Sequence, residues 1–309
     1  MWGLSNRRTR KKIIYTYRGR LKFYIRYAHT TSCSLFYTSS KMKKFFVIGN
    51  PIQHSKSPTV HNYWFSKYNV NSDYDKIQTD EKGLSKIVHQ IKLDEIHGVN
   101  ITVPFKQIII PYLDELSDQA KLSNSVNTVF KRAGKIIGDN TDIFGFRQSL
   151  EEVTLNKPLK SALLIGSGGV APSIIVALKE MGLEQIYLTN RTEEKAIALQ
   201  KKFTSLVKLV SWSDLKINLM VDIIINATSL GLPGSSNLEI PFDKLNQNTF
   251  VYDVIYNPLE TTFLKKAKEK NCIVINGLKM FLFQAQKAFE IWTGIKPEIN
   301  QELIKKLEL

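Results

Sequence analysis

The chain contains 309 residues, of which 43% are hydrophobic and 23% are charged, and it carries a formal net charge of +15. This length allows two domains with buried cores, and the balance of residue types is that of a globular protein. Two cysteines are too few for a disulfide framework, no apolar run approaches the ~18 residues of a membrane span, and the histidines lack the spacing of metal ligands. We therefore expect no metal site, no membrane partner and a reducing, cytoplasmic compartment.

Residues 1–41 differ in composition from the rest of the chain. They contain ten of the 43 basic residues and no Asp or Glu, which leaves 33 basic against 28 acidic residues elsewhere, a net charge of +5. Nucleic-acid binding is therefore not expected of the fold as a whole. We interpret residues 1–41 as a basic leader outside the fold. Three explanations stay open: an upstream start without folded structure, an organellar transit peptide, and a basic arm for an anionic surface.

From Met42 onward, short apolar runs alternate with amphipathic segments. In the first part, the pattern predicts strands at Phe45–Ile48 and Ile96–Val103, helices at Ser57–Lys67, Pro111–Leu122 and Asp142–Glu151, and a hairpin that joins Thr128–Phe130 to Lys135–Ile137 through Ala133-Gly134.

The second part repeats a strand-then-helix pattern. It predicts strands at Ala162–Ile165, Gln185–Thr189, Val221–Asn226, Phe250–Val254 and Ile273–Ile275. It predicts helices at Ala171–Met181, from about Thr192 and at Pro258–Lys270, and a long C-terminal helix that starts at Gly277. Such alternation is typical of an α/β architecture with mostly parallel sheets.

A glycine-rich turn follows the strand Ala162–Ile165 and precedes a helix. Its sequence, Gly166-Ser167-Gly168-Gly169-Val170-Ala171, fits the pattern G-x-G-x-x-[GA]. Glycines allow a tight turn and a close approach to a pyrophosphate, and the helix N-terminus offers free N–H groups. This context predicts a dinucleotide site.

The next strand ends at Asn190-Arg191-Thr192, where an NAD site usually places an acidic residue for the ribose hydroxyls. Here the side chains are neutral or cationic, and Lys195 adds a second cation one helical turn later. A guanidinium can pair with a 2′-phosphate through two hydrogen bonds. The pattern therefore favours NADP over NAD as the cofactor.

Polar groups also occur where strands are predicted to end, which is where α/β folds form their clefts. Their order along the chain is distinctive. It runs Gly49-Asn50-Pro51-x-x-His54-Ser55-x-Ser57-Pro58, Asn100-x-Thr102-Val103-Pro104-x-Lys106, Asn127-Thr128, Asn140-Thr141-Asp142-x-x-Gly145, the Gly166 turn, Asn190-Arg191-Thr192, Asn226-Ala227-Thr228-Ser229-Leu230-Gly231, Tyr252-Asp253-x-x-Tyr256-x-Pro258, Gly277-Leu278-x-Met280 and Gln284. In this order and spacing, from Met42 to the C-terminus, the chain resembles the shikimate dehydrogenase family.

The resemblance implies a role for each matching residue. Lys106 would be the acid/base group, and Asp142 would bind a ring hydroxyl and orient Lys106. The implied substrate-binding residues are Ser55, Ser57, Thr102, Asn127, Tyr256 and Gln284. The implied cofactor-binding residues are Gly166, Ser167, Gly168, Gly169, Val170, Asn190, Arg191, Thr192, Lys195, Val254 and Gly277.

The resemblance also implies an architecture and a reaction. Residues 42–141 with 277–309 would form a substrate-binding domain, residues 142–276 would form a Rossmann-like NADP-binding domain, and the active site would lie in the cleft between them. The reaction would be NADPH-dependent, reversible reduction of 3-dehydroshikimate to shikimate, a step of chorismate and aromatic amino-acid biosynthesis, in a monomer or homodimer. A quinate/shikimate dehydrogenase using NAD or NADP, and a catalytically silent regulator that senses the same acid, are the alternatives.

Overall fold

A computed structural model of the chain describes residues 14–17, 20–23, 41–155, 157–212, 220–242, 245 and 247–308. The contacts divide the chain between Ser40 and Lys41. In the first part, the strands β1 (Ile14–Tyr17) and β2 (Arg20–Phe23) pair in antiparallel fashion. Most of the predicted basic leader lies outside the described residues, so its place outside the fold stays a prediction.

The first large sheet is mixed. Its strands lie in the order β4 (Ser72–Gln78), β3 (Lys43–Gly49), β5 (Gly98–Ile101), β7 (Thr128–Arg132), β8 (Lys135–Asp139) and β6 (Glu115–Leu116). The strands β4, β3 and β5 run parallel, whereas β7 is antiparallel to both of its neighbours. Alternation along β3 separates two cores, because Phe45 and Val47 enter one apolar cluster and Ile48 enters the other.

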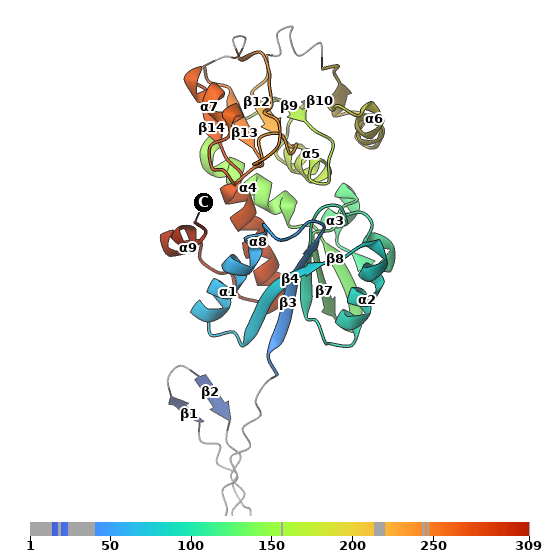
Figure 1. Ribbon diagram of the computed structural model, residues 1–309, viewed down its shortest axis with the longest axis vertical. Coiled ribbons are helices and arrows are strands. Elements are labelled where there is room, and N and C mark those ends of the chain that lie inside the picture. The colour runs from blue at the N-terminus through green and yellow to red at the C-terminus, as the bar shows by residue number, and fades with distance from the viewer. Residues whose placement is uncertain are drawn as a thin grey trace, which may run out of the picture. The chain divides into compact units, whose positions relative to one another are not determined.

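Helices cover both faces of this sheet (Figure 1). On the Ile48 side lies α2 (Glu81–Lys92), with Leu84 and Ile91 in the core. On the Phe45 side lie α1 (Ser57–Lys67), α8 (Leu278–Thr293) and α9 (Gln301–Lys306). The C-terminal helices therefore complete the part of the molecule that the N-terminal strands begin.

The second sheet is entirely parallel. Its strands lie in the order β11 (Val207–Leu209), β10 (Gln185–Thr189), β9 (Ser161–Ile165), β12 (Ile223–Asn226), β13 (Phe250–Asp253) and β14 (Ile273–Ile275). Helices α4 (Asp142–Thr154), α5 (Ala171–Glu180) and α6 (Glu193–Lys202) pack on one face, and α7 (Thr262–Glu269) packs on the other. The order reverses between β9 and β12, as in doubly wound nucleotide-binding folds.

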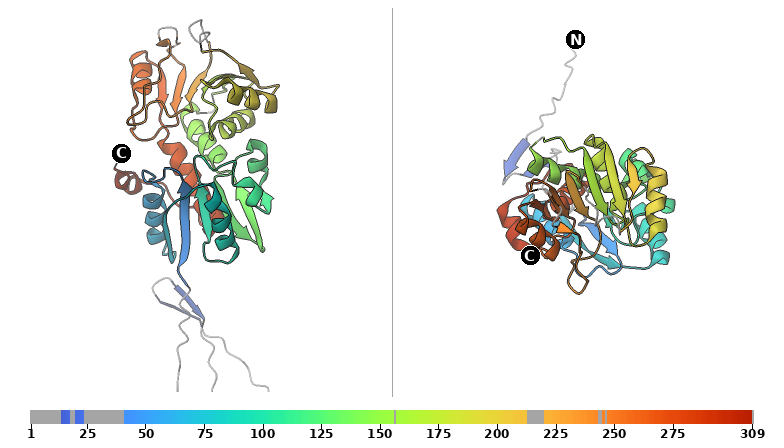
Figure 2. Two further views of the ribbon diagram at one scale, coloured as in Figure 1. Left: turned by 45° about the vertical axis from the view of Figure 1, so that its right-hand side comes forward. Right: turned by 90° about the horizontal axis from the view of Figure 1, so that it is seen from above.

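Two helices connect the parts built on the two sheets. In Figures 1 and 2, α4 and α8 run side by side between them. A Cβ atom at Gly145 of α4 would lie only 2.7 Å from the carbonyl oxygen of Met280 in α8, so a glycine is needed for this approach. None of the described helices is long and apolar enough to cross a membrane.

The predicted α/β class with two domains is confirmed, and most predicted elements are present. The prediction of a helix over Pro111–Leu122 is wrong. The segment instead forms a 3₁₀ turn (Ile110–Tyr112), the short strand β6, and the helix α3 (Asp118–Ser123), which begins where the Ser117 hydroxyl accepts from the Ala120 N–H.

The helix predicted to begin at Pro258 begins only at Thr262, because the side chain of Thr261 accepts from the Leu264 N–H and caps it there. After residue 41, four further elements were not predicted: β4, α2, β11 and α9. The strands β1 and β2, within the leader, were not predicted either.

Candidate active site

A buried ion pair joins the loop after β5 to the start of α4. Lys106 Nζ lies 2.6 Å from Asp142 Oδ2, and the two side chains are only 12% and 8% exposed. Lys106 also lies beside the glycine-rich turn, since a Cβ atom built on Gly169 would be 3.8 Å from its Cδ. The two residues that the sequence places in different segments therefore meet next to the predicted nucleotide site.

The position of Asp142 is set by Asn140, two residues before it. The side-chain oxygen of Asn140 accepts from the backbone N–H groups of Asp142 and Ile143, at 3.1 and 3.3 Å. Its NH₂ group lies 2.8 Å from the Ser125 carbonyl and 2.9 Å from the hydroxyl of Ser173 in α5. One buried amide thus holds the start of α4 and connects it to the helix that follows the glycine-rich turn.

Two predicted substrate-binding residues lie against the ion pair. Asn127 Nδ2 donates to Asp142 Oδ1 at 2.9 Å, so the carboxylate uses one oxygen for Asn127 and the other for Lys106. The same NH₂ group lies 3.4 Å from Gln284 Oε1 on α8. Gln284 in turn donates to the carbonyl of Phe281 at 2.8 Å. The structure therefore brings Lys106, Asp142, Asn127 and Gln284 into one cluster.

The remaining predicted substrate residues lie in neighbouring loops. The N–H of Ser57, the first residue of α1, donates to Ser55 Oγ at 3.3 Å. The Tyr256 hydroxyl accepts from the backbone N–H of Lys56, between the two serines, while its ring stacks on Phe281 with centroids 4.4 Å apart. Burial raises the pKa of the Tyr256 phenol, and the hydrogen bond from Lys56 opposes that rise. These contacts connect the loop after β13 to the start of α1.

Thr102 follows β5 and is half-buried. Its N–H donates to the Ile48 carbonyl at 2.9 Å, and its methyl group lies against Gly49, at the end of β3. No described contact joins its side chain to the Lys106–Asp142 pair.

The glycine-rich turn has the form that the sequence predicted. Gly166 has a φ of +107°, in the region that favours glycine, and an added Cβ there would lie 2.8 Å from Thr228 Cγ2. At Gly168, by contrast, an added Cβ would meet nothing closer than 4.0 Å. The Ser167 hydroxyl is buried and has no hydrogen-bond partner among the described residues. Helix α5 begins directly after the turn, at Ala171, so free N–H groups and open space meet here.

The residues predicted to surround the adenosine end follow β10. Asn190 accepts from the Ser167 N–H at 3.1 Å and donates to the Thr192 carbonyl at 2.7 Å, which fixes this loop to the glycine-rich turn. Arg191, Thr192 and Lys195 are exposed. Within the described part of the chain, neither cation forms an ion pair, and both are therefore available to an anionic ligand.

The last two predicted cofactor residues lie together. Val254 follows β13 and Gly277 precedes α8, and a Cβ atom on Gly277 would collide with the Val254 carbonyl oxygen. Val254 is held by its N–H, which donates to the Asn226 carbonyl at 3.1 Å. The side chains of the same motifs, Asn226 and Asp253, bond to one another at 3.1 Å and support the loops from within.

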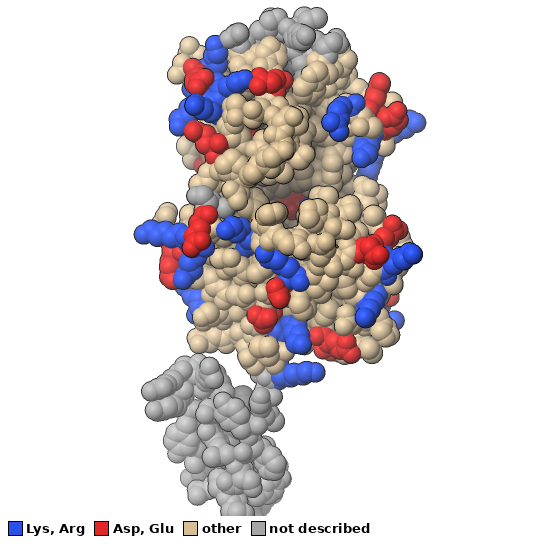
Figure 3. Space-filling view, in the orientation of Figure 1, with Lys and Arg blue, Asp and Glu red and all other residues tan. Residues whose placement is uncertain are grey.

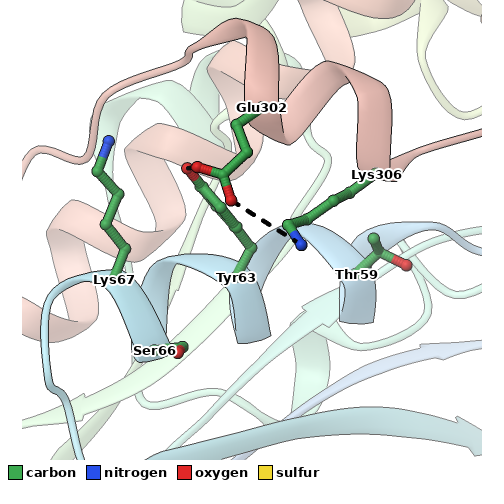
Figure 4. Close-up of a pocket in the computed structure, with 6 residues that line it drawn as sticks. All are labelled: Thr59, Tyr63, Ser66, Lys67, Glu302 and Lys306. Atoms are coloured by element: carbon green, nitrogen blue, oxygen red, sulfur yellow. Dashed lines mark hydrogen bonds and ion pairs between the residues drawn. The ribbon is translucent and has the colours of Figure 1, made fainter.

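The space-filling view shows a hollow between the parts built on the two sheets, with acidic atoms at its floor and few charged side chains around it (Figure 3). A second hollow lies between side chains of α1 and α9 (Figure 4). It is lined by Thr59, Tyr63, Ser66, Lys67, Glu302 and Lys306. None of these residues was predicted to belong to the site, and both lysines are already paired with glutamates.

No group of His, Cys, Asp and Glu residues in the described ranges could hold a metal ion. The sequence interpretation did not assign roles to four residues that support the site: Asn140, Thr128, Asn100 and Tyr74. Three of them stand inside the ordered motifs, which was the available signal, whereas nothing in the sequence marked Tyr74.

A buried Lys–Asp pair beside a glycine-rich turn, between two α/β domains of which one is doubly wound, defines a nucleotide-dependent oxidoreductase. Comparison with known proteins identifies the family. Three family models match: the shikimate dehydrogenase substrate binding domain over residues 47–129, shikimate/quinate 5-dehydrogenase over 150–254, and the shikimate 5′-dehydrogenase C-terminal domain over 277–301. The chain belongs to the shikimate dehydrogenase family.

Individual relatives agree with this assignment. A shikimate dehydrogenase (NADP⁺) of Pelagibacter ubique is 51% identical over 86% of this chain and 99% of its own length. The crystal structure of a shikimate dehydrogenase in complex with NADP⁺ is 38% identical, with a TM-score of 0.79 over 86% of this chain and 94% of that one. A shikimate 5-dehydrogenase of Listeria monocytogenes, in complex with shikimate and NAD, is 31% identical, with a TM-score of 0.79 over 87% and 96% of the two chains.

Proposed function

We propose that this protein catalyses the reversible, NADP-dependent oxidation of shikimate to 3-dehydroshikimate, a step of chorismate and aromatic amino-acid biosynthesis. The observation that carries the proposal is the Lys106–Asp142 pair, 2.6 Å apart and beside Gly169 of the glycine-rich turn. Oxidation of an alcohol releases a proton, and reduction of a ketone consumes one. NADP, when bound, accepts or supplies the hydride, and the protein must handle the proton.

Lys106 is the residue that we assign to the proton. Its ammonium nitrogen is the only cationic side-chain group that the described contacts place on the Asp142 carboxylate. Asp142 holds that nitrogen in place through Oδ2 and binds a ring hydroxyl of the substrate. Because Asn127 occupies Oδ1, the carboxylate cannot rotate freely, and the direction of the Lys106 side chain is fixed with it.

The substrate is a carboxylic acid with several ring hydroxyls, and it needs neutral donors and acceptors. Ser55 and Ser57, with Tyr256 beside them, would hold the carboxylate, while Thr102, Asn127 and Gln284 would bind the carboxylate or the ring hydroxyls. A site built on such hydrogen bonds rejects analogues that leave its polar groups unpaired. The two serines separated by one residue favour shikimate over quinate.

The chain's own residues fit an NADP molecule. The open space over Gly168 and the unpartnered hydroxyl of Ser167 suit a pyrophosphate at the start of α5. The exposed Arg191, with Lys195 one turn away and Asn190 and Thr192 flanking, suits a 2′-phosphate. Val254 and Gly277, together with Gly166, Gly169 and Val170, would line the rest of the cofactor.

Several coarser features complete the proposal. The substrate-binding domain would comprise residues 42–141 and 277–309, and the NADP-binding domain residues 142–276. The enzyme would be a monomer or homodimer that acts on small molecules in the cytoplasm, or in an organelle if residues 1–41 are a transit peptide.

The test is an absorbance assay of NADPH formation by the purified protein. Shikimate and quinate are each offered with NADP⁺ and with NAD⁺. Turnover is expected to be fastest with shikimate and NADP⁺. Faster turnover on quinate would indicate the broader quinate/shikimate enzyme. No turnover with either acid, while shikimate still binds, would indicate the silent sensor and overturn the proposal.

A further inference from the structure

A chain of buried hydrogen bonds runs beneath the Lys106–Asp142 pair, through residues without an assigned role. The Tyr74 hydroxyl donates to Asn100 Oδ1 at 2.7 Å. Asn100 Nδ2 lies 3.1 Å from both the Asn127 carbonyl and Thr128 Oγ1. Thr128 Oγ1 lies 3.1 Å from Asn127 Oδ1. Thr128 itself is 0% exposed, so this series of hydrogen bonds reaches Asn127 without contact between Thr128 and solvent.

The direction of donation along this chain is fixed. A backbone carbonyl can only accept, so the Asn100 group facing it must be the NH₂ group, which can only donate. The Thr128 oxygen therefore accepts from Asn100, and its proton is free to point to Asn127 Oδ1, or to Thr141 Oγ1 at 3.3 Å. The Thr141 N–H donates to the same Asn127 oxygen at 2.7 Å.

The Thr141 N–H, which can only donate, decides which way the Asn127 amide faces, and the Thr128 hydroxyl supports the same orientation. With its oxygen held on the Thr128 and Thr141 side, its NH₂ group must face Asp142 Oδ1 and Gln284 Oε1. The reversed amide would set its oxygen against both of these acceptors and its NH₂ against the Thr141 N–H. Buried networks of this kind specify one arrangement because every alternative leaves polar groups unpaired.

We propose that Thr128 is a positioning residue for the reaction. Its hydroxyl receives the hydrogen bond from Asn100 and orients the Asn127 amide toward the catalytic carboxylate and the substrate. Thr128 acts only through Asn127 and does not touch the substrate. Three groups hold the Asn127 oxygen from this side: the Thr128 hydroxyl, the Thr141 N–H and the Thr141 hydroxyl, which lies 3.1 Å away. Only the Thr128 hydroxyl among them also receives the hydrogen bond from Asn100, so substitution of Thr128 tests this series of hydrogen bonds without altering Asn127 itself. The inference rests on the proposed function.

The test compares Thr128→Val, which keeps the shape and removes the hydroxyl, with Thr128→Ser, which keeps the hydroxyl. Loss of a net hydrogen bond at a buried site corresponds to about a tenfold effect. We expect Thr128→Val to lower kcat/KM for shikimate by about that factor, through both kcat and KM, while KM for NADP⁺ stays unchanged. Thr128→Ser should restore kcat/KM. Equal kinetics of the Val and Ser variants would overturn the inference.

A double-mutant cycle separates positioning from general damage to the fold. In an Asn127→Ala background, Thr128→Val should have no further effect on kcat/KM, since the amide that it orients is absent. A full additional loss there would overturn the inference. If Thr128→Val does not fold, Thr128→Ala removes the same hydroxyl with a smaller side chain and should lower kcat/KM in the wild-type background but not in Asn127→Ala. A wild-type protein without shikimate-dependent NADPH formation would instead contradict the proposed function.

Discussion

His61 offers a test of how the substrate-binding part of the protein is stabilised. The residue lies on α1 with 0% exposure, and neither ring nitrogen has a hydrogen-bond partner among the described residues. Aromatic rings surround it: Tyr74 stacks on it with centroids 4.4 Å apart, and Trp64 meets it edge-on at 5.7 Å. A charged imidazolium has neither water nor a counter-charge in these surroundings.

The expected effect is a loss of stability in acid. Burial lowers the pKa of His61 from 6.5 to about 3. Between pH 6.5 and about pH 3, His61 is therefore protonated in the unfolded chain but neutral in the folded chain. The contribution to stability is complete above the unfolded pKa of 6.5 and is lost as the pH falls toward 3. At roughly 1.4 kcal/mol for each unit, the linkage relation gives a loss of about 2.5 kcal/mol from His61 between pH 7 and pH 4.5.

Replacement of His61 by Phe keeps an aromatic ring and removes the titrating group. We expect the free energy of unfolding, measured with urea at pH 7 and pH 4.5, to fall less in His61→Phe than in the wild type, by about 2.5 kcal/mol. His89→Leu, at an exposed histidine of α2, is measured in the same way as the control for removing a histidine outside the core. Because only the difference between two pH values is used, a change in packing common to both cancels. The same pH dependence in wild type and His61→Phe would refute the reasoning.

Three further predictions concern catalysis. Lys106→Ala should lower kcat by at least ~100-fold, the usual scale for an acid/base group, and should leave NADP⁺ binding, measured by titration calorimetry, nearly unchanged; near-normal turnover would remove Lys106 from the mechanism. Arg191→Ala should raise KM for NADP⁺ far more than KM for NAD⁺, because only the former carries a 2′-phosphate, and equal effects would contradict that contact. Deletion of residues 1–41 should leave turnover intact, and a large loss would assign the leader a role in the enzyme.

The sequence alone predicted the elements whose signals are local. Pro58 in the first turn marked α1, whose observed bounds are those expected, and the strand, turn and helix around Gly166 followed from the glycine spacing. The hairpin of β7 and β8 was predicted from Ala133-Gly134, and both residues have positive φ values there.

The errors occurred where long-range contacts decide the structure. Pro111–Leu122 has the apolar spacing of a helix. However, the Asp114 carboxylate accepts a hydrogen bond from the Ile136 N–H, and Glu115 pairs with Ile137. Part of the segment therefore forms a strand beside β8. Similarly, the alternation in β4 is weak, because only Tyr74 among its residues is buried. Local patterning cannot reveal a strand whose burial depends on one side chain.

The same distinction applies to the site. Residue types and order predicted one site that includes Lys106, Asp142, Asn127 and Gln284, and these four side chains do lie together. The order of residues could not predict how Asp142 and Gln284 are held at a fixed distance from one another. Asp142 is the first residue of α4, and Gln284 lies on α8, which begins directly after Gly277, the neighbour of Val254.

At Gly145 these two helices approach closely, since a Cβ there would lie 2.7 Å from the Met280 carbonyl oxygen and 2.9 Å from Gln284 Cβ. A side chain at 145 would meet α8 and so move the Asp142 carboxylate away from Gln284. The packing of this helix pair therefore affects the distance between Asp142 and Gln284, and a glycine is the residue that permits the close approach.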